Sequence, residues 1–191
     1  MIHRCSLALF LLVFAVVGRA QVAEFSVSGG VSRIGTIGNL GTAGSDVDLT
    51  NGFRLGLRFT LNTYRFFGHE FGYAYSRSHL QATGTDVSVP IHQGFYDFLI
   101  YATPEGSHIR PFATGGVQFS SFFPPGASAY YGNQITKFGI NYGGGVKARV
   151  TGAWGVRFDI RQYNSGQPFD LPTKNGRLKQ TEVSAGVSFN F

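Results

Sequence analysis

The chain has 191 residues, the length of one domain. Its single cysteine excludes a disulfide framework, and its net charge of +6 is dispersed rather than clustered, which excludes a nucleic-acid-binding patch and nucleic acid as a partner. Glycine, phenylalanine and tyrosine are plentiful while charged residues make up only 14% of the chain, a combination typical of many strands and turns.

The first twenty residues form a segment apart from the fold. A short basic start is followed by an unbroken run of apolar or small residues that is too short to span a membrane as a helix. Small residues then stand at Gly18 and Ala20, the two positions that a signal peptidase reads. We therefore expect a secretory signal peptide at 1–20 and one exported domain at 21–191.

From there on, apolar and polar residues alternate with a period of two, the spacing of a β-strand whose two faces differ. The clearest case is 53–62, where phenylalanine and leucine alternate with arginine, glycine, threonine and asparagine. We expect eight strands, at about 23–34, 53–62, 70–76, 91–102, 110–121, 137–150, 154–161 and 181–191. The longer connections are expected to be loops, at 35–48, 80–90, 122–136 and 164–178.

The last of these strands ends on an aromatic residue, Phe191, with Val187 and Phe189 at alternate positions before it. Aromatic residues at the ends of membrane-barrel strands lie at the lipid–water interface. The pattern resembles the C-terminal signal that outer-membrane barrels present to their assembly machinery, so we expect these three residues to form an assembly signal. The alternative is the last strand of a soluble sandwich, because alternation marks any half-buried strand.

Alternation alone does not say which face is inside, because a lipocalin has the same period with the faces reversed. Side-chain volume decides, since the interior of an eight-stranded barrel is barely wide enough to be filled by side chains. The apolar face carries too many aromatic side chains to fit there, whereas the glycine-, serine- and threonine-rich face fits. The predicted fold is all-β: an eight-stranded antiparallel up-and-down transmembrane β-barrel with its apolar face toward lipid.

Several runs resemble the OmpA-type family of eight-stranded outer-membrane barrels, and the resemblance covers 21–191. The residues that carry it are Arg110-Pro111-Phe112 with Gly115-Gly116, the runs 143–149 and 154–161, and Phe191. The resemblance implies the barrel fold, a place in the outer membrane of a Gram-negative envelope, and contact with outer-membrane lipids, lipopolysaccharide and the barrel assembly machinery. Because the sequence ends at Phe191, we expect no peptidoglycan-binding domain. We also expect a monomer.

Charged residues on the polar face are expected to point into the lumen and to pair there, because unpaired charges in a narrow lumen are strongly destabilising. This lumen charge network comprises Glu24, Arg54, Arg58, Glu70, Asp97, Lys147, Arg149, Arg157, Asp159, Arg161 and Glu182. One interpretation is a structural plug of ion pairs. The other is a narrow or gated pore with a basic constriction.

No enzyme, metal or cofactor signature accompanies these charges. The four histidines after residue 20, His69, His79, His92 and His108, lack metal-ligand spacing, so we expect no metal site and no cofactor. A barrel-borne lipid hydrolase needs a histidine and a serine close together on late strands with an acid nearby, and no histidine follows His108. We therefore expect that the protein is not an enzyme.

The expected loop at 122–136 carries several aromatic residues, which can bind glycans or partner proteins when exposed. The candidate loop contacts are Phe123, Tyr130 and Tyr131. The competing and favoured interpretation of Phe122 and Phe123 places them in the outer aromatic girdle.

These observations favour an integral outer-membrane barrel with a structural or interaction role in the envelope, four displayed outer loops, and a lumen closed by polar and charged side chains. Two alternatives stay open: a narrow pore for small solutes or ions, and a lipid-modifying outer-membrane enzyme. Close pairing of the lumen charges would favour the structural or interaction barrel. A cluster of histidine, serine and an acid facing lipid near the outer rim would favour the lipid-modifying enzyme.

Overall fold

The computed structural model describes residues 22–39, 46–82, 85–123, 134–166 and 177–191. Its strands are β1 (Val22–Ile34), β2 (Thr36–Asn39), β3 (Asp46–Leu49), β4 (Gly52–Tyr64), β5 (Phe67–Ala82), β6 (Thr85–Tyr101), β7 (Ile109–Phe122), β8 (Ile135–Arg149), β9 (Trp154–Gly166) and β10 (Arg177–Asn190). In these ranges no helix is long and apolar enough to cross a membrane. The expected signal peptide lies outside them.

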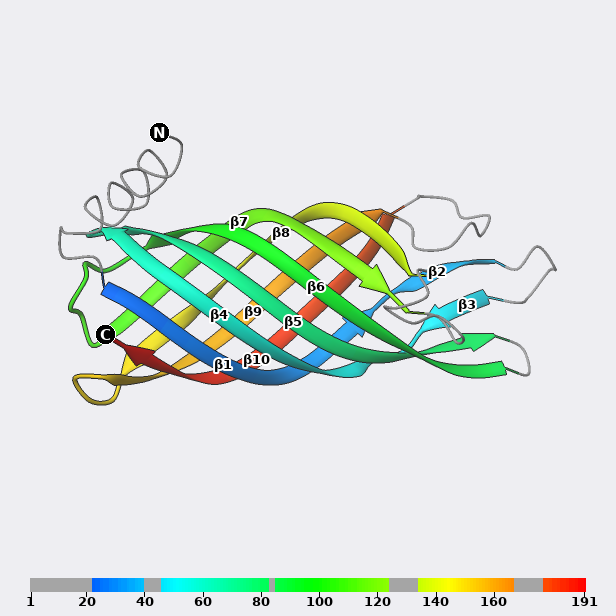
Figure 1. Cartoon of the computed structure of the whole chain (residues 1–191), viewed down its shortest axis with the longest axis horizontal. Helices are drawn as coiled ribbons and strands as arrows, with labels where there is room; N and C mark the ends of the chain where they lie inside the picture. The colour runs from blue at the N-terminus through cyan, green and yellow to red at the C-terminus, as the bar shows by residue number, and fades with distance from the viewer. Residues whose placement is uncertain (1–21, 40–45, 83–84, 124–133, 167–176) are drawn as a thin grey trace, which may run out of the picture.

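The eight long strands close into an antiparallel barrel, with the strands tilted to its axis (Figure 1). Strands consecutive in sequence pair around the wall, and the barrel closes where β1 pairs with β10. At this seam Phe25 lies opposite Phe189 and Val31 opposite Val183. The predicted all-β, eight-stranded, antiparallel up-and-down barrel is therefore confirmed.

The two ends of the barrel differ. The start of β1 and Phe191 lie at one end, where the backbone N–H of Phe191 donates to the carbonyl of Ala23 at 3.0 Å (Figure 1). The connections from β4 to β5, from β6 to β7 and from β8 to β9, at 65–66, 102–108 and 150–153, lie at this end, which we call the turn end. The opposite end, the loop end, carries β2, β3 and the β5–β6 hairpin.

Each strand turns its apolar face outward. On β4 the side chain of Leu57 is 45% exposed, whereas its neighbour Arg58 is 1% exposed. On β9 Phe158 is 59% exposed and Arg157 is fully buried. An apolar exterior around a polar interior is the arrangement that a bilayer stabilises, because lipid solvates the outer face and the closed sheet satisfies its own backbone groups.

Two of the expected loops contain strands instead. Within 35–48, β2 pairs with β3, and β3 continues the sheet by placing Leu49 opposite Leu80 of β5. Within 80–90, β5 and β6 stay paired up to Ala82 and Thr85. The prediction of loops was wrong at these positions because a strand that faces neither lipid nor an apolar core can be polar on both faces. Such a strand shows no alternation of apolar and polar residues.

The interior also holds aromatic side chains that the alternation did not predict. On β6 Phe95 and Tyr101 point inward, although Tyr96 between them points outward with the apolar face. The ring of Phe95 fits because Gly72, on the adjacent β5, has no side chain: a Cβ there would lie 2.0 Å from the ring. Alternation of apolar and polar residues therefore did not identify the aromatic residues of β6 that lie in the lumen.

Candidate functional site

The middle of the lumen is filled by an ion-paired cluster, which we call the lumen network. Four arginines come from β4 and β9, and four carboxylates from β5, β6, β9 and β10, and every one of these residues is at most 2% exposed. The members are Arg54, Arg58, Arg157 and Arg161 with Glu70, Asp97, Asp159 and Glu182. Its four positive and four negative charges balance.

Glu70 is the centre of the turn-end half of the network. Its carboxylate accepts from Arg157 Nη1 at 2.5 Å, from Arg161 Nη2 at 2.6 Å and from the Thr60 hydroxyl at 2.8 Å. Asp159 lies between the same two arginines, 2.6 Å from Arg157 Nε and 3.1 Å from Arg161 Nη2. The two carboxylates therefore share two guanidinium groups, the planar donors best suited to bridging carboxylates.

Glu182 is the centre of the loop-end half. It lies 2.6 Å from Arg58 Nη2 and 2.8 Å from Arg54 Nε, and it accepts from the Tyr163 hydroxyl at 2.8 Å. The guanidinium of Arg54 also lies 4.5 Å from the centre of the Tyr163 ring, within cation–π range. Arg161 extends the network to Asp97 at 2.5 Å. The network thus connects opposite walls of the barrel.

A belt of amides and hydroxyls covers the loop-end side of this network. Gln93 on β6 accepts from Arg54 Nη1 and donates to Gln180 on β10 at 2.9 Å, and Gln180 donates to Ser32 on β1. The belt therefore continues the cross-lumen hydrogen bonding from the arginines to uncharged side chains.

Beyond the belt, the lumen is closed at the loop end by a buried apolar cluster, which we call the loop-end plug. Its members are Ile34, Leu49, Val89, Ile91, Phe122 and Leu178. Phe122 is fully buried in it, so the interpretation of Phe122 as an outer-girdle residue was wrong. Phe122 is one of the inward-facing residues of β7. The pairing of β7 with β6 extends to this residue, which lies opposite Ile91.

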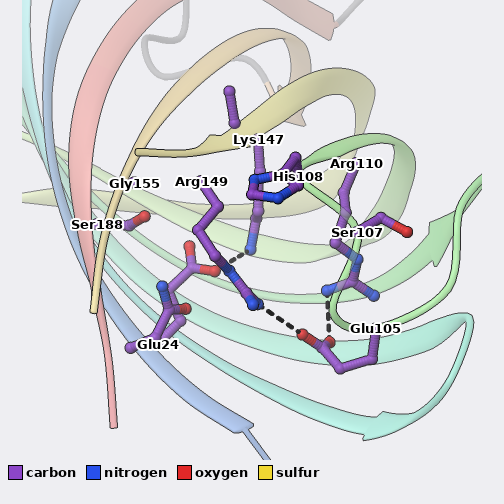
Figure 2. Close-up of a pocket in the computed structure, with 11 residues that line it drawn as sticks. Glu24, Glu105, Ser107, His108, Arg110, Lys147, Arg149, Gly155 and Ser188 are labelled. Atoms are coloured by element: carbon purple, nitrogen blue, oxygen red, sulfur yellow. Dashed lines mark hydrogen bonds and ion pairs between the residues drawn. The ribbon is translucent and has the colours of Figure 1, made fainter. Parts of the chain in front are cut away.

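The mouth at the turn end is covered by the connection between β6 and β7 (Figure 2). Glu105, on that connection, lies 2.5 Å from Arg110 Nη1 and 3.5 Å from Arg149 Nη2. Its backbone N–H donates to the carbonyl of Arg65 on the neighbouring turn at 2.9 Å. Behind it Lys147 pairs with Glu24 at 2.9 Å. Glu105 therefore links its own turn to the turn at Arg65 and to the ends of β7 and β8 across the opening.

The structure places the eleven predicted lumen charges at three levels. Eight form the lumen network, Glu24 and Lys147 form a buried pair nearer the turn end, and Arg149 lies partly exposed at the mouth. Glu105 was missed because it lies in a turn, where period two gives no inward or outward assignment. Gln93 and Tyr163 were missed because a search for charges passes over neutral side chains that complete an ionic network.

The predicted assembly-signal residues lie on the outer wall at the turn end. The ring of Phe189 lies 5.1 Å from that of Trp154 and 6.0 Å from that of Phe191, and Phe191 contacts Phe59 at 6.4 Å. Val187 is half exposed on the same face. These contacts form part of an aromatic girdle at the turn end.

Of the candidate loop contacts, only Phe123 lies within the described residues. Its ring lies 4.9 Å from that of His92, edge to face, and its N–H donates to the Pro90 carbonyl at 3.0 Å. Phe123 therefore continues the wall beside β6. Tyr130 and Tyr131 lie outside the described residues.

A histidine, an acid and a serine do meet on the β5–β6 hairpin. His79 Nδ1 lies 3.0 Å from Asp86, and Ser88 stands opposite His79 in the register. The Ser88 hydroxyl, however, accepts from Arg77 Nε at 2.7 Å and makes no hydrogen bond with His79. The hydrogen bonds of the described residues therefore join the imidazole to Asp86 and the serine to Arg77, and do not join the three groups in one chain. In the described part of the chain no three histidine, cysteine or acidic residues are placed to hold a metal ion.

Comparison with solved structures gives the same architecture. OprG from Pseudomonas aeruginosa superposes with a TM-score of 0.63 at 15% identity, covering 90% of this chain and 97% of OprG. Neisserial surface protein A gives 0.64 at 14% identity, with 89% and 97% covered. Outer membrane protein W of E. coli gives 0.52 at 20% identity, with 88% and 97% covered. At these identities the likeness shows the fold.

Comparison with curated protein sequences found no match. The family profile described as "Outer membrane protein beta-barrel domain" matches residues 6–191, nearly the whole chain. With the closed eight-stranded barrel and its apolar exterior, this match shows that the chain belongs to the outer membrane protein β-barrel domain family and that it is an outer-membrane protein.

Proposed function

We propose that the protein is a closed outer-membrane barrel whose role in the envelope is structural or interactive rather than conductive or enzymatic. The observation that carries the proposal is the lumen network, in which four arginines and four carboxylates are buried and ion-paired across the barrel. A permeating ion would have to displace paired charges and then pass the apolar loop-end plug. Both steps are energetically unfavourable.

We further propose that the loop end faces the outside and the turn end the periplasm. Two features support this orientation. The connections at the turn end are short and those at the loop end include the longest of the chain, as is usual for such barrels. The aromatic cluster of Trp154, Phe189 and Phe191 would then lie at the periplasmic interface, where its last strand would be presented to the assembly machinery, as the family resemblance implies.

The pore alternative is tested by electrical recording. The purified full-length barrel should be inserted into a planar lipid bilayer, with a general porin inserted under the same conditions as the positive control. We expect no steady conductance from this protein, because the lumen network and the plug block the path. A stable channel with a conductance comparable to that of the porin control would contradict the proposal and favour the pore.

A further inference from the structure

The lipid-facing wall formed by β8, β9 and β10 contains a shallow apolar groove. It is lined by Gly143–Gly145, Val146, Phe158, Ile160 and Val183. Gly144 occupies an outward-facing position of β8, where it pairs with Ala113 on β7 and with Ile160 on β9. The wall therefore has no side chain at that point. Phe158 and Ile160 project beside it, 59% and 62% exposed. The groove has the form and chemistry to hold an extended hydrocarbon chain by dispersion contacts.

The next outward-facing residues of these strands toward the loop end are polar. In the register Tyr142 on β8 faces Gln162 on β9, Gln162 faces Thr181 on β10, and Thr181 faces Arg33 on β1. The Tyr142 hydroxyl donates to Gln162 Oε1 at 3.0 Å. A second depression opens here, with Arg33, Gln162, Thr181 and Lys179 in its lining. The apolar groove therefore leads directly into a polar, hydrogen-bonding depression.

The depression carries two positive charges and no described negative one. Lys179 is the outward residue beside Thr181 on β10, diagonal to Arg33, and both cations are exposed. Neither forms an ion pair or a side-chain hydrogen bond with another described residue. Of the carboxylates whose side chains are described, only Asp86 lies at the loop end, and it pairs with His79 on the β5–β6 hairpin. The two cations are thus available to an external anion.

We propose that this wall is a binding site for one phosphorylated glycolipid of the outer leaflet. A phosphate is held by Arg33 and Lys179, sugar hydroxyls lie against Gln162 and Thr181, and one acyl chain occupies the groove at Gly144. Arginine binds phosphate through paired donors and lysine as a point charge, so the two together suit a phosphate ester. The placement of the phosphate in the outer leaflet rests on the orientation proposed above; the site itself does not.

The test uses the full-length barrel in nanodiscs of zwitterionic phosphatidylcholine, titrated with diphosphoryl lipid A. Native mass spectrometry gives the lipid A fraction at which half of the barrels retain one molecule. Each basic residue near an anionic lipid strengthens binding about fivefold, so the double variant Arg33→Ser, Lys179→Ser should raise that fraction about 25-fold. Arg77→Ser, which removes an exposed arginine on β5, should leave it unchanged.

The groove is tested separately. Val183→Trp fills it and should weaken retention of lipid A severalfold, whereas Val187→Trp, two outward positions away on the same strand and similarly exposed, should not.

Lipid A stripped of its phosphates should bind the unchanged protein as weakly as diphosphoryl lipid A binds the double variant. Equal retention by the double variant and the unchanged protein would overturn the site, and so would an equal loss with Arg77→Ser. Because nanodisc binding does not depend on orientation or conductance, failure here would leave the proposed function standing.

Discussion

Each arginine of the lumen network owes its position to the carboxylates around it. Moving an isolated charge out of water costs several kcal/mol even after the protein relaxes, so a buried guanidinium is stable only when its partners remain. Glu70 contacts Arg157, Arg161 and, at 3.7 Å, Arg58. Asp159 reaches the same three arginines, with Arg58 at 4.0 Å. Loss of the charge of Glu70 would therefore leave three buried arginines with one carboxylate fewer.

Glu70→Gln keeps the size of the side chain and removes its charge. We expect it to lower the free energy of unfolding by about 3–5 kcal/mol, the usual effect of leaving a buried ion unpaired. The measurement is denaturant unfolding of the barrel in lipid vesicles, followed by loss of the heat-modifiable folded band.

Glu105→Gln is the matched control. Glu105 also pairs with two arginines, but its side chain is 23% exposed at the mouth, so we expect a loss of about 1 kcal/mol or less. Equal losses for the two variants would mean that burial does not control the strength of the network.

At the scale of the strands, the sequence was informative wherever one face had to be apolar. Alternation located all eight barrel strands, because lipid outside and polar side chains inside impose period two. It could not define β2, β3 or the extension of β5 and β6, since beyond the bilayer neither face has to be apolar. It also could not predict that Phe95 lies inward, because that depends on a glycine at position 72 of the neighbouring strand.

The outward face of β4 gives a direct test of the bilayer as solvent. Leu57 lies near the middle of the strand, between Val27 and Tyr73 on the outer surface. Leu57→Arg should lower the free energy of unfolding in vesicles by about 2–4 kcal/mol more than Leu57→Ala does, the penalty for an arginine at the bilayer midplane.

The control is Ile109→Arg, at the turn-end start of β7 and 60% exposed, where the expected loss is about 0–1 kcal/mol. If both arginine variants were equally harmless, the outer surface of β4 would not face hydrocarbon.

Across the whole molecule, the lumen is closed at three successive levels. Glu105 and its partners cover the mouth at the turn end, the lumen network fills the middle, and the loop-end plug closes the other end. The charges of the network could be predicted from strand parity alone. The plug could not, because the loop-end positions of β6 and β7 look like any other apolar residues in the sequence. Only the register shows that Ile91 and Phe122 share the inside of the same barrel.

Orientation is tested on intact cells with a membrane-impermeant maleimide. Asp86→Cys, at the loop end and 60% exposed in its side chain, should be labelled from outside. Gly152→Cys, in the β8–β9 turn where an added Cβ meets nothing within 4 Å, should be labelled only after the outer membrane is permeabilised. Labelling of Gly152→Cys alone in intact cells would invert the proposed orientation.

The seam between β1 and β10 also bears on how the barrel forms in time. The first and last strands of the fold are neighbours, so the sheet cannot close until the whole chain is present. Contacts this distant in sequence form slowly, and until they form both edge strands expose unpaired backbone groups that can pair with other chains. The nascent polypeptide therefore has to be kept from aggregating after its synthesis is complete, until pairing of β1 with β10 covers both edges.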